Sequence, residues 1–163
     1  MSPTIDPGDD APRRMLIIEM VPQTSWGANL RRVLKRSQWD KLRRKVYLQA
    51  GNKCVICDGV GPRHPVECHE VWDYDDEALV QTLMGMEALC PACHEVKHFG
   101  RTLEVGNGGR AAHHLMNVNG WDRDQTNQHI HDAFTVWNYR SHKEWTLNLS
   151  WLESEGIPIP ERV

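Results

Sequence analysis

Apolar residues recur at helical spacing in the first third of the chain. From residue 38 to residue 50 they stand three or four positions apart, at Trp39, Leu42, Val46 and Ala50. This spacing places them on one face of a helix. Ser37 is a suitable cap for its first turn, and Gly51 is a suitable stop.

Four further helices are predicted around this one. The first runs from Trp26 to about Lys35, with Thr24 or Ser25 as its cap. Another begins directly after Cys90, because proline suits the first helical position, and continues to about His98. The last two cover 110–118 and 122–141. In the second of these, a stripe of apolar residues is expected to face the core: Ile130, Ala133, Phe134 and Trp137.

Three stretches have the pattern of strands. Met15–Val21 is a short apolar run ended by proline, which fits either a strand or a helical turn. Val66–Trp72 follows several turn signals, and apolar and polar residues alternate over 145–151 as in a half-buried strand. The region between Cys54 and Cys93 is otherwise expected to be rich in loops, with a short segment at 78–83. The pattern therefore predicts an α+β fold, and we see no internal repeat.

The composition is that of one soluble domain. The chain has 163 residues, of which 40% are hydrophobic and 25% are charged, and about one domain is expected at this length. No apolar run approaches the ~20 residues of a membrane span, and the first residues lack the pattern of a secretory signal. We therefore expect a cytoplasmic protein without a membrane partner, beginning with a disordered tail over 1–14.

The two signs of charge are separated along the chain. Between residues 31 and 53 nine basic residues stand against one acid, whereas 67–95 holds eight acids and no lysine or arginine. The formal net charge of −3 therefore does not exclude nucleic acid, because a basic surface can form locally. The basic face of the helix at 38–50 fits phosphate contact or an ordinary solvated surface. The candidate nucleic-acid contacts are Arg43, Arg44, Lys45 and Lys97.

Four of the five cysteines form two Cys-x-x-Cys pairs, Cys54 with Cys57 and Cys90 with Cys93. An odd number of cysteines without an export signal favours metal over disulfides. Four thiolates on two turns suit tetrahedral Zn²⁺, and such a site is structural because no coordination position stays open. A redox protein is a weaker alternative, since thiol exchange does not explain two pairs and neighbouring histidines.

Two histidines follow the second cysteine pair. His94 and His98 stand four residues apart, so on a helix both rings project from one face. That geometry suits a second metal ion. The polar stretch Glu67–Trp72 lies in a strand-like frame between the same two cysteine pairs, so we expect zinc to bring it close to the histidines.

These residues together resemble the HNH endonucleases, in the zinc-binding subgroup of the ββα-metal nucleases. The resemblance covers roughly residues 37–100, from Trp39-Asp40-x-Leu42-Arg43 to Cys93-His94-x-x-x-His98. A larger run, 21–76, also resembles bacterial and phage HNH proteins. The resemblance implies an HNH ββα-metal domain over 37–105 with a four-cysteine zinc site. A segment with a helix, 15–36, would pack on this core, and a helical extension, 106–163, would end in a short strand.

The resemblance also implies an activity, the hydrolysis of DNA phosphodiester bonds. One divalent cation, Mg²⁺, Mn²⁺, Ni²⁺ or Zn²⁺, would be held by His94 and His98 and would bind the scissile phosphate. His69 corresponds to the general base, and a neutral imidazole with a pKa of ~6.5 can accept a proton at neutral pH. DNA is the expected partner, with RNA left open, and no motif demands a homo-oligomer.

Two positions depart from the HNH pattern. The residue before the general base is usually histidine or aspartate, but here it is Cys68, a good ligand for Zn²⁺ or Ni²⁺ and a poor one for Mg²⁺. Either Cys68 binds a softer metal, or Glu67 or Glu70 supplies an oxygen. Strand alternation favours Glu67, which shares a face with His69. The asparagine that names the motif is missing near 85–87, where Glu87 can substitute in part.

These departures favour an alternative function, a zinc-stabilised nucleic-acid- or protein-binding module whose nuclease activity has decayed. The seven tryptophans mostly fall in helical or strand stripes, so we expect core packing and not base stacking. The histidines beyond the matched stretch are expected to be surface or core residues. They are His113, His114, His129, His131 and His142.

Overall fold

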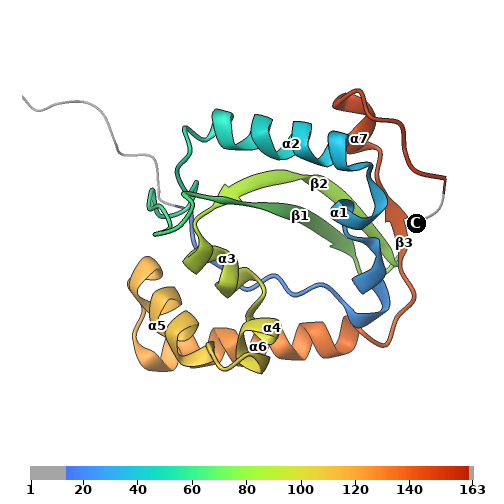
Figure 1. The fold of residues 1–163 in the computed structure, drawn as a ribbon. Helices are drawn as coiled ribbons and strands as arrows, with labels where there is room; N and C mark the ends of the chain where they lie inside the picture. Colours follow the sequence, from blue (N-terminus) through green and yellow to red (C-terminus); the bar gives the residue numbers. More distant parts are fainter. Residues whose placement is uncertain (1–13, 162–163) are drawn as a thin grey trace, which may run out of the picture.

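A three-stranded sheet lies between two layers of helices in the computed structural model, which describes residues 14–161 (Figure 1). β1 (Glu67–Asp75) and β2 (Val80–Leu89) form an antiparallel hairpin. β3 (Thr146–Asn148) pairs in parallel with the start of β2. α2 (Arg36–Gln49) covers one face of the hairpin, and α3 (Pro91–Lys97) follows β2 directly and packs on the other face. The predicted α+β class is confirmed.

The other helices lie at the ends and below the sheet. A 3-10 helix, η1 (Gln23–Ala28), leads into the short α1 (Leu30–Val33). α4 (Phe99–Glu104), α5 (Gly108–Asn119) and α6 (Arg123–Arg140) form the layer on the α3 side (Figure 1). α7 (Trp151–Ser154) ends the described fold and shares a core cluster with α2.

Local sequence signals explain several helix ends. The backbone N–H groups of Asp122 and Gln125 bond each other's side chains at 2.9 and 2.8 Å, a capping box that starts α6. Gly120 ends α5 with a φ of +64°, a conformation that suits glycine. The predicted cap of α2 is wrong: the helix begins one residue earlier than Ser37, and Gln38 accepts the N–H of Lys35 at 3.0 Å.

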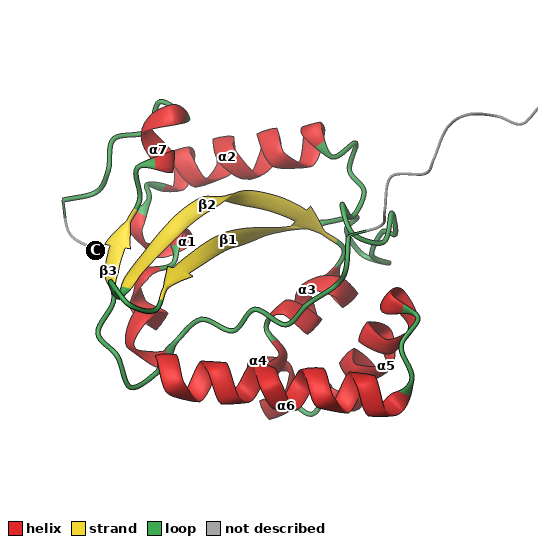
Figure 2. Cartoon of the chain, turned by 180° about the vertical axis from the view of Figure 1, so that it is seen from behind, coloured by secondary structure: helices red, strands yellow, loops and turns green. Residues whose placement is uncertain are grey.

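The segment before α2 differs from its prediction. The helix expected over 26–35 is divided into η1 and α1, because Asn29 accepts the N–H of Arg32 at 3.1 Å and starts a new helix there. Residues 15–21 form no strand. They run as extended coil between the sheet and α6 (Figure 2), where Ile18 N–H donates to His129 Nε2 at 3.0 Å. Side chains of the helical layer thus replace a strand partner.

The hairpin is longer than the sequence pattern predicts. β1 continues to Asp75, and β2 occupies a region where we expected mostly loop. The register shifts between Val71 and Trp72, which leaves Met84 unpaired and 56% exposed. Such a bulge breaks the alternation by which a strand is recognised. The strand expected over 145–151 is shorter, because Trp151 starts α7.

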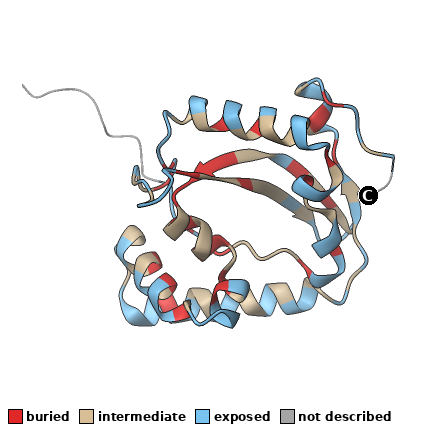
Figure 3. Cartoon of the chain, viewed as in Figure 1, coloured by how far each residue is buried: buried red, intermediate tan, exposed pale blue. Residues whose placement is uncertain are grey.

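Buried residues line both faces of the sheet and the inner face of α2 (Figure 3). Leu42 and Val46 of α2 are buried, as the helical period predicts. The largest buried cluster contains residues from the end of β2, from α3 and from α5, and also Leu16 and Ile18. Within residues 14–161 no helix has both the length and the apolar character needed to cross a membrane. The tail predicted over 1–14 lies almost entirely outside the described residues. The predicted boundaries of the HNH domain, at residues 36 and 105, stay a prediction.

Candidate metal centres and the adjoining groove

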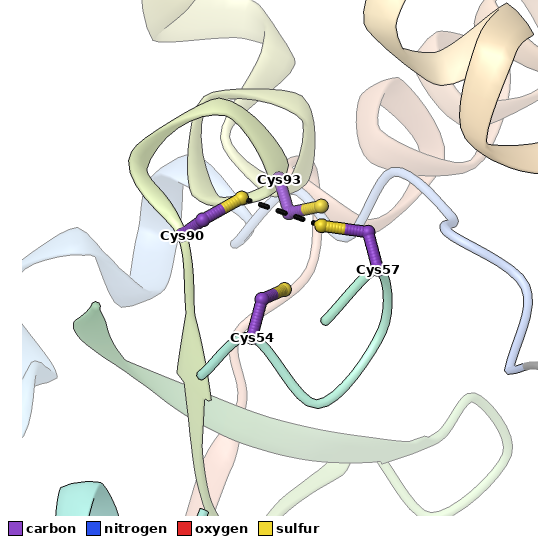
Figure 4. Close-up of side chains that lie close together, drawn as sticks. All are labelled: Cys54, Cys57, Cys90 and Cys93. Carbon is purple, nitrogen blue, oxygen red and sulfur yellow. Dashed lines mark hydrogen bonds between the residues drawn. The ribbon is translucent and has the colours of Figure 1, made fainter. Parts of the chain in front are cut away.

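The four cysteines of the two pairs meet in one group, here called the sulfur centre (Figure 4). Their sulfur atoms all lie within 4.8 Å of one another, and Cys57 Sγ is 3.6 Å from Cys90 Sγ. Tetrahedral zinc with Zn–S bonds of ~2.3 Å separates its sulfurs by about 3.8 Å. The donor set and spacing therefore fit zinc, and the group can hold such a metal ion.

Two short turns build the sulfur centre. In the first, Asp58 N–H donates to Cys54 O at 2.9 Å, and Gly59 N–H points to Cys57 Sγ at 3.4 Å. Asp58 has a φ of +59°, and a Cβ on Gly59 would lie 3.1 Å from the Cys57 sulfur. The turn thus favours a residue that tolerates a positive φ at position 58 and a small residue at position 59. In the second, Cys90 precedes a proline that starts α3.

The pKa values of Cys54, Cys90 and Cys93 depend on the neighbouring sulfur atoms. Hydrogen bonds from the Cys90 and Cys93 thiols hold the pKa of Cys54 far below its ordinary value. The hydrogen bond to Cys54 in turn raises the pKa of Cys90 to about 12, and contact with both neighbours raises that of Cys93. Among these three cysteines the thiolate form is thus favoured at Cys54 alone, and a bound divalent ion would stabilise further thiolates.

His114 belongs to the surroundings of the sulfur centre. Its Nε2 lies 3.2 Å from Cys93 Sγ, although we expected an ordinary surface or core histidine. A ring N–H that donates to a ligating thiolate would stabilise the negative sulfur. The two residues stand 21 positions apart on different helices, so no spacing rule could have found this contact.

Three histidines form a second group, here called the imidazole centre. His69 projects from β1, while His94 lies on α3 and His98 ends it. One ring nitrogen of each lies within 4.8 Å of the others, and the ring centroids are 4.9 to 5.4 Å apart. The predicted i,i+4 pair therefore shares a site with His69, which the sequence analysis placed nearby only as a general base.

Burial favours the neutral form of His94 and His98. Burial lowers the pKa of His94, and burial together with the two neighbouring imidazoles lowers that of His98 to about 3. His69 is 3% exposed, and within the described part of the chain its Nδ1 has no hydrogen-bond partner. Imidazole nitrogens from three histidines, two of them held neutral by burial, fit the donor set that a divalent transition metal prefers.

Glu67 holds the ring of His94, one of the three rings of the imidazole centre. Glu67 Oε2 lies 2.6 Å from His94 Nδ1, and its other oxygen is 2.7 Å from His64 Nε2. Burial raises the pKa of Glu67, but these histidine contacts more than offset it, so the net shift is downward. Glu67 thus holds a histidine here, and its direct coordination of metal stays a prediction. Glu70 is engaged elsewhere, accepting the N–H of Leu30 at 2.6 Å.

Glu19 is a site residue that the sequence analysis missed. Its Oε2 lies 3.2 Å from His69 Nε2, and its Oε1 lies 2.9 Å from Lys97 Nζ. Burial raises the pKa of Glu19, but the His69 hydrogen bond and the Lys97 charge lower it overall. The carboxylate is therefore charged at neutral pH and leaves His69 only its Nδ1 free.

The predicted phosphate contact of Lys97 is wrong. Lys97 is 1% exposed, and its ammonium is enclosed between Glu19 at 2.9 Å and Glu87 at 3.8 Å. A buried lysine is stable only with such partners, and because its ammonium is buried among them Lys97 is not accessible to a nucleic acid. Glu87 pairs with His69 in the strand register and also binds Arg14 at 2.8 Å. Its substitution for the missing asparagine stays untested.

Cys68 does not join the ligands of the imidazole centre, contrary to the first alternative. Strand alternation directs it away from His69, and it packs beside Val46 and Ala88 under α2. Burial raises the pKa of the Cys68 thiol to about 12, so the thiolate is disfavoured.

An open groove of about 1110 Å³ borders the imidazole centre. His94 and His98 lie on its wall, and four arginines contribute to the rest: Arg31, Arg36, Arg43 and Arg101. Only Arg43 of the predicted contacts is among them. Arg44 and Lys45 lie on a separate shallow surface, and Lys45 forms an ion pair with Glu155. We call the open groove lined by Arg31, Arg36, Arg43 and Arg101 the arginine groove.

Neither a family model, nor a curated protein, nor a solved structure matches this chain. The fold and the sulfur centre define an α+β protein with a four-cysteine group able to hold a metal ion.

Proposed function

We propose that the chain is an HNH-type endonuclease that hydrolyses DNA phosphodiester bonds with one divalent cation and a histidine general base. The observation that carries the proposal is the convergence of His69, His94 and His98 beside the arginine groove. The hairpin of β1 and β2 followed by α3 agrees with the order of elements in a ββα-metal core. The sulfur centre would hold the ends of this unit together through zinc.

The three histidines and two neighbouring carboxylates, Glu19 and Glu67, have separate roles in this proposal. A cation held by His94 and His98 would polarise the scissile phosphate and stabilise the leaving oxygen. His69 accepts the proton of the attacking water through Nδ1, because Glu19 occupies Nε2. Glu67 fixes the ring of His94 through Nδ1 and leaves Nε2 for the cation.

The arginine groove supplies the contacts to the nucleic-acid backbone. Arg31, Arg36 and Arg101 are exposed on its walls, and guanidinium groups bind phosphate oxygens in pairs. Four arginines line the groove together with three acids, Asp40, Glu67 and Glu95, so its lining carries a small positive excess on a chain whose net charge is −3. This is how an acidic protein would bind DNA.

The test is plasmid nicking by the purified full chain after its zinc has been counted. Mg²⁺, Mn²⁺, Ni²⁺ and Zn²⁺ are added in turn, and His69→Ala and His131→Ala are assayed beside the parent. We expect His69→Ala to lower cleavage by roughly 10²–10⁴-fold with its zinc retained. His131→Ala, which changes an exposed histidine of α6, should cut at the parent rate. Cleavage by His69→Ala at that rate would refute the general-base role.

Cobalt binding separates a general base from a metal ligand. Co²⁺ is titrated into zinc-loaded parent, His69→Ala and His94→Ala, and its visible absorption is followed. If His69 is the base, its loss leaves the Co²⁺ affinity close to that of the parent, whereas His94→Ala lowers it strongly. Equal losses in both variants would make His69 a third ligand.

A second candidate function is a zinc-stabilised module that binds nucleic acid without cutting it. Two observations favour it: His69 is only 3% exposed, and Cys68 does not replace the usual ligand. The same assay decides between the two functions. A folded, zinc-loaded protein that binds plasmid but leaves it intact with every cation would support the binding module.

A further inference from the structure

A second cavity, here called the aromatic cavity, lies between η1, β1, α4 and α6. Its volume is about 530 Å³, within the ~300–1,000 Å³ range of small-molecule sites. Four aromatic side chains line it, and these are Trp26, Trp72, Phe134 and Trp137. Trp26 is 53% exposed, so aromatic surface faces solvent at this place.

Hydrogen bonds fix the indole rings of the aromatic cavity. The Nε1–H groups of Trp26 and Trp137 both donate to Val21 O, at 2.9 and 3.0 Å. The Nε1–H of Trp72 donates to Glu70 Oε2 at 3.2 Å. Each indole has only one donor, so all three are satisfied within the protein. What the rings still offer a ligand is their aromatic surface, and they hold it in one orientation.

Gln81 adds an unsatisfied polar group to this wall. It lies on β2, is 1% exposed and lines the aromatic cavity. Its Oε1 has no hydrogen-bond partner within the described residues. A buried amide oxygen without a partner is costly. Because this oxygen is itself buried, a ligand N–H would reach it only after the Gln81 side chain turns towards the cavity. The aromatic walls therefore suit a flat heteroaromatic ring, and a turned Gln81 would accept from an N–H donor on that ring.

The aromatic cavity adjoins the arginine groove. His98 and Arg101 line both of them, so a backbone phosphate bound at these residues would lie next to the cavity. A ligand that combines a phosphate with a flat, N–H-bearing ring is a nucleotide. We propose that the aromatic cavity binds one unpaired nucleobase of the strand whose backbone lies in the arginine groove. This inference rests on the proposed function, and it extends that function to recognition of a base.

The test uses the zinc-loaded full chain without any second cation, so that binding is measured without cleavage. The probe is a short single-stranded oligodeoxythymidylate with one central 2-aminopurine, and its partner probe carries an abasic residue there. We expect 2-aminopurine fluorescence to be quenched on binding, and the abasic probe to bind roughly 10-fold more weakly, as for one lost base stack. In Trp26→Ala this difference between the probes should disappear.

Two further variants make the test specific. Trp145→Ala removes a tryptophan that packs on Tyr74, 5.2 Å between ring centroids, outside both cavities, and should keep the difference. Gln81→Met removes the unpartnered oxygen at similar volume. It should fold as the parent does and show a weaker preference among oligonucleotides that carry A, C, G or T at the central position.

The outcomes separate this inference from the proposed nuclease. Equal affinity of the parent for both probes, or an undiminished difference in Trp26→Ala, would overturn the base-binding cavity even if plasmid is cut. Base-dependent affinity that requires Trp26, without cleavage by any cation, would support the cavity and refute the nuclease. Failure to bind either probe would overturn the cavity, while plasmid cleavage scored in parallel still decides the nuclease.

Discussion

The sulfur and imidazole centres share one helix but differ in surroundings and in what they can do. Cys93 and His94 are neighbours on α3, yet each belongs to a different centre. Successive helical residues point about 100° apart, so one turn of helix can serve both. Cys93 is fully buried among sulfurs, whereas His94 lies on the wall of an open groove. A closed set of four thiolates suits a structural role, while an open set of imidazoles leaves room for a substrate.

Loss of one thiolate should have the largest effect, because it removes a ligand from the closed centre. We expect Cys54→Ser to lose its zinc and its cooperative thermal unfolding, since structural zinc in small sites contributes roughly 10–16 kcal/mol. Zinc content and circular dichroism melting measure this. Cys68→Ser, a change outside the sulfur centre, should keep zinc and melt within a few degrees of the parent. A zinc-free Cys54→Ser that melts like the parent would refute the structural role.

Weakening a carboxylate beside the open centre should have a smaller and more selective effect. Glu67→Gln keeps the size of the side chain but removes the charge that holds His94. We expect the Co²⁺ affinity of the imidazole centre to fall about 10–100-fold, with zinc content and melting temperature unchanged. Glu77→Gln, in the exposed turn of the hairpin, is the matched control. Unchanged Co²⁺ affinity in Glu67→Gln would remove this carboxylate from the site.

Acid should destabilise the fold through His98, which burial favours in its neutral form. The pKa of His98 is about 3 in the folded protein against an ordinary 6.5, so below pH 6.5 the unfolded chain takes up a proton that the folded chain does not. Stability should therefore fall with decreasing pH from 6.5 towards 3, by up to about 1.4 kcal/mol per pH unit. Urea unfolding between pH 7 and 5.5, without a second cation, measures the slope.

The control for this pH dependence is His98→Asn, which cannot titrate. Thiolates also lose zinc in acid, so the difference between parent and variant is the quantity that reports His98. The variant should show the shallower slope. Identical slopes would mean that His98 is not held neutral by the fold.

The smallest expected effect concerns the arginines outside both centres. Arg36 lies in the arginine groove with its side chain 94% exposed, whereas Arg44 lies on the shallow surface beside it. We expect Arg36→Ala to weaken DNA binding a few-fold and to lower the slope of log affinity against log salt by ~0.9. Arg44→Ala should change neither. Fluorescence anisotropy over a salt series checks this, and equal effects of both changes would place the DNA elsewhere.

The sequence alone determined what depends on residues close together in the chain. The apolar period of α2, the helix expected over 122–141 and the proline start of α3 depend on local signals, and the structure bears them out. The two cysteine pairs predicted a metal group because each pair sits on a turn that brings its own two sulfurs together. For the same reason the i,i+4 spacing of His94 and His98 placed both rings on one face.

Only the tertiary structure decided which residues meet across long distances in the chain. Glu19 reaches His69 across 50 positions, and this depends on the path of an extended segment that shows no strand pattern. Lys97 was predicted to contact nucleic acid, and lysines usually lie on the surface. In the fold it is buried, because Glu19 and Glu87 provide carboxylates around it. Local spacing constrains the neighbours within one helix, whereas burial and charge pairing depend on how separate elements pack.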